Sequence, residues 1–410
     1  MALVVQKFGG TSVGSPERVR SVAERIKYAV DKGHQVLVTV SAMGDSTDRL
    51  VNLSRQVAGQ DPDTREMDVL LATGEQVSAS LLAMCLQQKG IASRSFLGHQ
   101  IAINTNNAHG RARIETIETK QLRAALNNQE VAIVAGFQGV NAQGDITTLG
   151  RGGTDTTAVA LAVVLEADEC QIYTDVDGIY TTDPRIEPQA RQLDHITFEE
   201  MLELSSLGSQ VMQTRAMEFA SKHMVPIRVL NSFDPEFNTQ GKGTLITKDY
   251  TDAEAPLVAG ITFTRDEAEI NLRNVPDEPG IAYRILSPIA DAGIEVDMIV
   301  QTASRDGDVD FSFTVHRENY QKALSLVEIT SQIMPNTDIS SNDKVVKLSV
   351  VGVGMRSHAG VASTIFEALA NESINIRMVS TSEIKVSVLI DESSLETGVR
   401  CLHKAFNLAT

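Results

Sequence analysis

Short apolar runs alternate with longer segments of helical periodicity along the first half of the chain. Four runs are continuous enough to be buried strands of a parallel sheet, and they cover residues 3–8, 35–40, 131–135 and 170–174. The segments between them predict helices that begin at Ser15-Pro16 and cover 46–58, 75–89 and 155–167. This alternation predicts an α/β sandwich with a mainly parallel sheet, in which ligands bind at the carboxyl ends of the strands.

The last third of the chain contains an internal repeat with an offset of 80 residues, because Gly280 aligns with Gly360 and Ile285 with Ile365. Each copy has the strand and helix order of a ferredoxin-like β-α-β-β-α-β unit, which indicates a duplicated domain. A polar stretch without apolar periodicity precedes the repeat. The predicted organisation is a catalytic domain over 1–247, a linker over 248–256, and two repeat domains over 257–340 and 341–410.

The 410 residues carry a formal net charge of −17, which disfavours binding to nucleic acid or to a membrane surface. Any polyanion must therefore be held by a local cluster of cations and backbone N–H groups. Cys85, Cys170 and Cys401 are far apart and have no metal-ligand spacing, so we expect reduced thiols in a cytoplasmic protein. The N-terminus has no signal-peptide pattern, and the apolar helical stretch 158–165 is far shorter than a membrane span.

Two glycine-rich turns follow predicted strands, and each carries a cation. They are Lys7-Phe-Gly-Gly-Thr-Ser12 and Gly150-Arg-Gly-Gly-Thr-Asp155. Glycines let backbone N–H groups approach a phosphate, and the helix that follows adds partial positive charge. Lys7 can reach the phosphates from its strand end, and Arg151 can bind a carboxylate or phosphate bidentately. Asp155 can orient Lys7 or help to hold a divalent cation. The two turns together predict a phosphoryl-transfer site.

Each turn alone has a simpler interpretation, since a Gly-Gly after a strand is usually a tight turn, Arg151 could be a solvated cation and Asp155 a helix cap. Other nucleotide-binding classes are disfavoured by missing motifs. The chain has no Gly-x4-Gly-Lys-[Ser/Thr], no His-Arg-Asp loop with Asp-Phe-Gly, and no Gly-x-Gly-x-x-Gly in the first turn. A P-loop enzyme, a protein kinase and a Rossmann dehydrogenase are therefore not expected.

Together with these turns, four further motifs resemble the aspartate kinases, members of the amino acid kinase superfamily that carry two C-terminal ACT domains. The motifs are Val40-Ser-Ala-Met-Gly44, Gly74-Glu75, Tyr173-Thr-Asp-Val-Asp-Gly178 and Tyr180-Thr-Thr-Asp-Pro-Arg185. The resemblance covers essentially the whole chain. It implies transfer of a phosphoryl group from MgATP to the side-chain carboxylate of L-aspartate, the first step towards lysine, threonine, methionine and diaminopimelate.

The resemblance also implies roles for individual residues. Lys7 and Asp155 would be catalytic, Arg151 would bind the α-carboxylate of aspartate, and Glu75 its ammonium group. Ser41, Thr47 and Thr154 would line the same pocket. ATP would be held by Lys7, Gly9, Gly10, Thr174, Asp175, Tyr180 and Arg185. The chemistry is consistent with this set, because the attacking carboxylate is already ionised and needs no general base. Without the resemblance, Glu75 would be interpreted as an exposed acid early in a helix, and Asp183-Pro184 as a turn.

For the repeat, the resemblance implies feedback regulation by lysine and/or threonine, bound between ACT domains of a homo-oligomer. The matching effector positions are Asp277, Gly280, Ile281, Ala282 and Gln301 in the first copy and Val361, Asn375, Ile376, Ser382 and Glu383 in the second. By periodicity alone Ile281, Ala282 and Ile376 are core positions, and the polar ones are surface positions.

Two features depart from the family pattern: Gln210 stands where a lysine is common, and 234–242 is a longer, more polar segment that we interpret as a surface loop. Two other functions stay open from the residues. One is a different amino acid kinase acting on glutamate, acetylglutamate, carbamate or UMP, which the C-terminal repeat disfavours. The other is an inactive ACT-type amino-acid sensor, which the intact Lys7, Arg151 and Asp155 disfavour.

Overall fold

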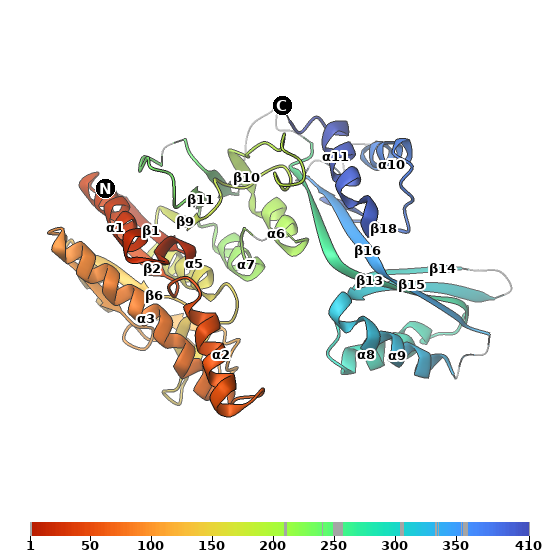
Figure 1. Ribbon diagram of the computed structural model, residues 1–410, viewed down its shortest axis with the longest axis horizontal. Coiled ribbons are helices and arrows are strands. Elements are labelled where there is room, and N and C mark those ends of the chain that lie inside the picture. Colours follow the sequence, from red (N-terminus) through yellow and green to blue (C-terminus); the bar gives the residue numbers. More distant parts are fainter. Residues whose placement is uncertain are drawn as a thin grey trace. The chain divides into compact units, whose positions relative to one another are not determined.

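The computed structural model describes residues 2–208, 211–239, 241–248, 257–303, 307–332, 334, 336–353, 355 and 360–409. The chain forms two compact units (Figure 1). The first comprises Met1–Ile179, Gln192–Ser206 and Gln210–Ala255, and the second comprises Tyr180–Arg191, Leu207–Ser209 and Pro256–Thr410. The predicted linker 248–256 lies, apart from Lys248, outside the described residues.

The first unit is built on an eight-stranded sheet with the order β10-β12-β11-β9-β1-β2-β6-β3. All neighbouring strands run parallel except β11 and β12, which confirms the predicted mainly parallel sheet. The strands are β1 (Leu3–Phe8), β2 (Gln35–Val40), β3 (Ser93–Phe96), β6 (Val131–Ala135), β9 (Glu169–Thr174), β10 (His195–Thr197), β11 (Ile227–Asn231) and β12 (Thr244–Thr247).

Helices cover both faces of this sheet. On one face, α1 (Pro16–Asp31) and α3 (Thr64–Gln88) bury apolar side chains against alternate residues of β1, β2 and β6. On the other face, α5 (Gly153–Leu165) contacts β1, β2 and β9 and packs against α7 (Thr214–His223). The remaining helices of the unit are η1 (Thr11–Val13), α2 (Ser46–Ala58), α4 (Lys120–Asn127) and α6 (Phe198–Ser206).

Helix α3 differs from its prediction. The sequence predicted a helix over 75–89, whereas α3 begins at Thr64, where the Asp63 side chain accepts a hydrogen bond from the Glu66 amide at 3.1 Å. Gly74 lies inside the helix. A glycine is needed at this position because a Cβ would come within 2.7 Å of the Ala42 side chain. Among the described helices, α3 alone has the length and hydropathy of a possible membrane span, but nine of its residues are buried in the domain. It is therefore a core helix.

A small sheet that the sequence did not predict lies beside the main one, with the order β5-β4-β7-β8. Its strands are β4 (Ile103–Thr105), β5 (Ile114–Ile117), β7 (Gln138–Val140) and β8 (Ile146–Thr148). Strands of three or four residues are too short to show a clear period in the sequence. Strand β8 leads directly into the second glycine-rich turn, so this sheet positions that turn.

The second unit contains a six-stranded sheet with the order β14-β15-β13-β16-β18-β17 (Figure 1). Its strands are β13 (Gly260–Pro276), β14 (Val296–Ala303), β15 (Asp308–His316), β16 (Asp338–Val351), β17 (Met378–Thr381) and β18 (Lys385–Asp391). The helices are α8 (Ile281–Asp291), η2 (Arg317–Asn319), α9 (Tyr320–Ser331), α10 (Val361–Asn371), η4 (Glu392–Ser394) and α11 (Leu395–Ala405).

The structure confirms the internal repeat. Helices α8 and α10 begin 80 residues apart, and each follows a glycine in the left-handed conformation, Gly280 (φ 92°) and Gly360 (φ 116°). Two separate apolar cores form, one under α8 and α9 and one under α10 and α11. The second unit is therefore a pair of similar α+β domains joined in one sheet.

Candidate active site

A cavity of about 310 Å³ lies at the carboxyl ends of β1, β2 and β6, against the N-terminus of α5. It is lined by Lys7, Gly9, Gly10, Ser41, Thr47, Glu75, Phe137, Gly150, Arg151, Gly152, Gly153, Thr154, Asp155 and Gln213. The structure thus brings both glycine-rich turns to one place. The two catalytic candidates, all five substrate-binding candidates and the two glycines assigned to ATP share this cavity.

Lys7 and Asp155 form an ion pair across the cavity wall, with Lys7 Nζ 2.7 Å from Asp155 Oδ1. Lys7 is the penultimate residue of β1, and Asp155 lies in the first turn of α5. The side chains are only 11% and 13% exposed, so water screens the pair weakly. On the opposite face of the sheet, the rings of Phe8 and Tyr173 stack at 4.6 Å and hold the ends of β1 and β9 together. Asp155 therefore fixes the position of the Lys7 ammonium group.

The Arg151 turn depends on two glycines in the left-handed region, Gly150 (φ 77°) and Gly152 (φ 69°). A Cβ on Gly152 would come within 1.9 Å of the Gln213 side chain, so no other residue fits there without a shift. Arg151 itself is exposed and forms no ion pair with any residue in the described part of the chain. Its guanidinium group is available for an anionic ligand. Ser41 Oγ donates a hydrogen bond to Thr154 Oγ1 at 3.0 Å, which joins this turn to the end of β2.

Glu75 is buried, contrary to what its sequence context alone indicated. The residue is 4% exposed, and its Oε1 accepts a hydrogen bond from the Ala42 amide at 3.0 Å. Oε2 has no hydrogen-bond partner among the described residues. Burial raises the pKa of Glu75 to about 7, although the Ala42 hydrogen bond acts in the opposite direction. An unpartnered carboxylate oxygen in a cavity wall is suited to a cationic group of a ligand.

The cavity contains two side chains that the sequence analysis missed, Phe137 and Gln213. Phe137 lies two residues after the end of β6 and has φ 68°, a strained value for a residue with a Cβ. Its position after a predicted strand was a usable signal, but the backbone strain was not visible in the sequence. Gln213 precedes α7, and only the approach of that helix to Gly152 places it in the cavity.

The remaining ATP candidates do not line this cavity. Thr174 and Asp175 lie at the carboxyl end of β9, next to β1, and Thr174 Oγ1 donates a hydrogen bond to Asp175 at 3.1 Å. Tyr180 and Arg185 belong to the second unit. Arg185 is paired there with Asp183, with Nη2 2.8 Å from Oδ2. Gln210 lies outside the described residues.

The segment around Tyr180 and Arg185 is built into the second unit. Thr181 Oγ1 is hydrogen-bonded to His403 Nε2 of α11 at 3.0 Å, in a buried position. Ile186 packs in the apolar core under α10 and α11, and Arg400 Nε donates a hydrogen bond to its carbonyl at 3.0 Å. Tyr180 and Arg185 therefore belong to a segment that contacts within the second unit hold in place.

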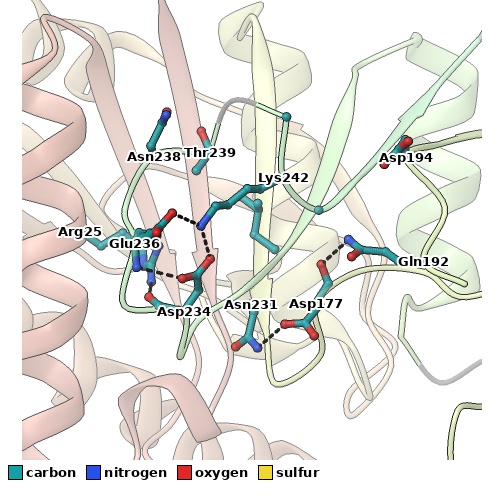
Figure 2. A pocket seen from close by; sticks show the side chains of 13 residues that line it. Arg25, Asp177, Gln192, Asp194, Asn231, Asp234, Glu236, Asn238, Thr239 and Lys242 are labelled. Carbon is teal, nitrogen blue, oxygen red and sulfur yellow. Dashed lines mark hydrogen bonds and ion pairs between the residues drawn. The ribbon is translucent and has the colours of Figure 1, made fainter. Parts of the chain in front are cut away.

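A second cavity, of about 260 Å³, lies at the carboxyl ends of β9 and β11 (Figure 2). Its polar side chains pair with one another: Asn231 donates to Asp177 at 2.7 Å, and Lys242 contacts Asp234 at 2.6 Å and Glu236 at 2.8 Å. Arg25 of α1 donates to the Asp234 carbonyl at 2.6 Å. These contacts hold the segment predicted as a surface loop over 234–242, of which residue 240 is outside the described residues, against the domain.

The effector candidates lie around the first turns of α8 and α10 and the ends of β14 and β17. The side chain of Ile281 is buried in one apolar core, Val361 is buried in the other, and Ala282 and Ile376 pack against these cores. The five polar candidates are all exposed: Asp277, Gln301, Asn375, Ser382 and Glu383. Gly280 contributes its backbone. Contacts with an effector would therefore come from the exposed group.

Three parts of the chain match family models. Residues 2–231 match the amino acid kinase family, and residues 269–332 and 348–406 each match the ACT domain. The strand ends of the parallel sheet carry a paired lysine, two glycine-rich turns and an arginine. This combination, with the family match, defines a small-molecule kinase. The chain belongs to the amino acid kinase family.

Relatives over the full length narrow the assignment. An aspartate kinase of Pseudomonas putida is 56% identical over 409 residues, which cover 100% of this chain and 98% of the relative. The structure of E. coli aspartokinase III in complex with aspartate and ADP (R-state) superimposes with a TM-score of 0.80 at 26% identity, covering 98% of this chain and 99% of that one. The same enzyme with lysine and aspartate (T-state) gives 0.77 at 26% identity, with the same coverage. Within the family, the chain belongs to the aspartate kinases, as its motifs indicated.

Proposed function

We propose that this protein transfers the γ-phosphoryl group of ATP to the side-chain carboxylate of L-aspartate, forming 4-phospho-L-aspartate. The observation that carries the proposal is the convergence of the Lys7–Asp155 pair with Arg151 and Glu75 around one cavity. The aspartate kinase relatives give the substrate its identity. The reaction would be the first step towards lysine, threonine, methionine and diaminopimelate.

The cavity distinguishes the groups of aspartate by charge. Arg151 binds the α-carboxylate, and the unpartnered oxygen of Glu75 accepts from the ammonium group. These two contacts orient the side-chain carboxylate towards Lys7. Ser41, Thr47 and Thr154 supply hydroxyl groups to the same wall. Because the nucleophile is an ionised carboxylate, the site needs no base, and its main task is to bring two anions together.

Lys7 stabilises the transferring phosphoryl group, and Asp155 keeps its ammonium in place. The N-terminus of α5 and the backbone of Gly9 and Gly10 add partial positive charge around the same position. Thr174, Asp175, Tyr180 and Arg185 hold the remainder of ATP.

Mg²⁺ would enter with the nucleotide, where it neutralises phosphate charge and positions the phosphoryl group. The donor set fits this arrangement. The described residues contain no group of three or more His, Cys, Asp or Glu side chains suited to a metal ion. Mg²⁺ typically uses phosphate oxygens, water and one or two carboxylates rather than a cage of protein ligands. Of the two carboxylates in the cavity wall, Glu75 and Asp155, Asp155 is the one beside Lys7.

We further propose that the protein is a cytoplasmic homo-oligomer whose ACT domains bind lysine and/or threonine as feedback inhibitors. ACT matches to both copies and a lysine complex of a related enzyme support regulation by an end product. The three cysteines are unpaired, as expected in a reducing compartment. We retain the domain division at 1–247, 257–340 and 341–410, with the addition that Tyr180–Arg191 packs with the second unit.

A coupled assay of ADP formation tests the reaction itself. We expect kcat/KM with L-aspartate to be at least about tenfold higher than with L-glutamate, N-acetylglutamate or UMP, because one extra methylene alone costs about 1–3 kcal/mol. Higher activity with any of the other three would assign a different amino acid kinase. No activity with any of them would favour the sensor alternative.

Effector binding is tested by Asp277→Ala and Glu383→Ala. Each removes an exposed carboxylate from a proposed contact with an effector ammonium group. Loss of one charged hydrogen bond, about 1.5–3 kcal/mol, should raise the half-inhibitory concentration of lysine or threonine roughly 10- to 100-fold. Inhibition is measured with each amino acid alone and with both together. Curves that overlay those of the parent protein would show that these carboxylates do not bind the effector.

A further inference from the structure

Helix α3 carries a second buried acid besides Glu75. Asp68 is 1% exposed and does not line the active-site cavity. Seven residues separate Asp68 from Glu75, which is two helical turns, so the two carboxylates lie on the same side of α3, about 10 Å apart along its axis. One rigid helix therefore holds the proposed ligand of the substrate ammonium group and a buried carboxylate whose function is not yet assigned.

All the hydrogen bonds of Asp68 go to the segments that flank the Arg151 turn. Oδ1 accepts from Thr148 Oγ1 at 2.5 Å and from the Gly110 amide at 3.0 Å. Oδ2 lies 3.1 Å from the same amide and 2.7 Å from His109 Nδ1. Thr148 is the last residue of β8, two positions before Gly150. The Gly110 carbonyl lies 3.1 Å from the position that a Cβ on Gly150 would occupy.

Two arginines complete this anchorage. Arg215 of α7 donates to the Leu149 carbonyl at 2.9 Å and to the Ala112 carbonyl at 2.7 Å, so it joins the same two segments from the other side. Arg65, one turn before Asp68 on α3, binds Asp145 in the β7–β8 turn at 3.1 Å. The backbone leading into the Arg151 turn is thus fixed by charged groups from both neighbouring helices.

The turn itself supplies little rigidity. Gly150 and Gly152 both have positive φ, and glycines lose this conformation easily because they have many others available. Arg151 stands between them and is exposed. Its position relative to Glu75 must be set from outside the turn. An α-amino acid has its ammonium and carboxylate groups on the same carbon, so a displacement of about 1 Å between their two ligands is costly.

We propose that Asp68 is a positioning residue for substrate recognition: by holding Thr148 and Gly110 against α3, it sets the distance between Arg151 and Glu75. This role rests on the proposed aspartate kinase activity. In this proposal α3 sets the spacing of the two residues that bind the α-amino and α-carboxylate groups. Lys7 and Asp155, on β1 and α5, act on the phosphoryl group. Loss of the Asp68 contacts should therefore weaken aspartate binding and leave ATP binding unchanged.

The experiment compares Asp68→Asn with Thr148→Val in the full-length protein. Thr148→Val removes one donor at nearly constant volume, so it tests the contact even if Asp68→Asn is poorly folded. We expect KM for aspartate to rise about 10-fold or more in each, with KM for ATP and kcat within about threefold, since a buried hydrogen bond to a charged group contributes 1.5–3 kcal/mol. The double variant should raise KM by less than the product of the two single effects, because both changes weaken the same Asp68–Thr148 contact. Thr116→Val, an exposed threonine in β5 of the same small sheet, is the matched control.

Competitive inhibitors separate positioning from general loosening. Succinate keeps both carboxylates of aspartate, and β-alanine lacks the α-carboxylate. Both variants should raise the inhibition constant of succinate and leave that of β-alanine unchanged, because only the former uses Arg151. An unchanged KM for aspartate in both variants, or equal weakening of ATP and β-alanine, would overturn the positioning role alone. A parent protein that does not phosphorylate aspartate would overturn the proposed function and, with it, this role.

Discussion

Lys7→Met is expected to lower kcat by at least about 10³-fold and to change KM for aspartate by less than about threefold. Methionine retains the apolar length of the side chain but removes the ammonium group that Asp155 holds at 2.7 Å. Loss of a single preorganised donor at a developing charge already costs 10²–10³ in kcat, and a full positive charge contributes more. The substitution leaves Arg151 and Glu75, the proposed aspartate ligands, in place. Steady-state kinetics in both substrates measure the two effects separately.

The matched control for this prediction is Lys27→Met, which removes a half-exposed lysine that pairs with Asp31 within α1. It should leave kcat unchanged. Lys7→Arg keeps the charge but replaces a compact ammonium with a planar fork, so we expect only partial activity. If Lys7→Met retained turnover within tenfold of the parent, the charge on Lys7 would have no place in the mechanism.

Glu75→Gln is expected to stabilise the free protein at pH 8 and, at the same time, to raise KM for aspartate about 10- to 100-fold. Burial raises the pKa of Glu75 from 4.5 to about 7 in the folded protein. The favourable contribution of this carboxyl group is therefore complete below about pH 4.5 and is lost as the pH rises through 7. Above pH 7 the folded protein carries a desolvated carboxylate, at a cost of about 2–4 kcal/mol from 1.36 kcal/mol per pKa unit. Glutamine keeps the Ala42 hydrogen bond without that charge.

The same carboxylate predicts a pH dependence of substrate binding. In the proposed site the ammonium group of aspartate would bind the ionised form of Glu75. KM for aspartate should therefore rise as the pH falls below about 7, and binding should release a proton. Calorimetry in buffers of different ionisation enthalpy detects that proton. In Glu75→Gln both effects should vanish. Denaturation at pH 5 and pH 8 measures the stability change, with the exposed Glu115→Gln as the control. Equal stability of Glu75→Gln and parent at pH 8 would contradict the assigned burial cost.

Four of the eight strands of the main sheet, β1, β2, β6 and β9, could be predicted from the sequence, because they are continuous apolar runs with clear ends. Strands β3, β10, β11 and β12 were not predicted. The bounds of β1, β2 and β6 agree with prediction to the residue. The small sheet was missed because its strands have three or four residues. Helix α3 was predicted over 75–89 but begins at Thr64. Gly74 lies inside the helix, where the absence of a Cβ allows close contact with Ala42.

The active site was predictable where it follows strand ends and not where it depends on packing. Lys7 and the 150–155 turn converge because parallel strands bring their carboxyl ends to one edge. The burial of Glu75 and the contacts of Asp68 depend on how α3 lies against two loops, and no local pattern signals that. The packing of Thr181 and Ile186 with the second unit is likewise a matter of tertiary structure.

Residues Tyr180–Arg191 belong to the second unit, although the segments before and after them belong to the first. The kinase and regulatory parts are therefore connected at more than the linker. Truncation of the protein at 248–256 would remove the apolar core that covers Ile186 and its neighbours. The shortened enzyme would then expose an apolar surface that is prone to aggregation. Exchange of whole regulatory modules between relatives during evolution would meet the same obstacle, since the recipient segment and its core must change together. Because the second unit includes a segment from within the kinase part of the sequence, regulation is expected to evolve by gradual substitution rather than by exchange of whole ACT modules.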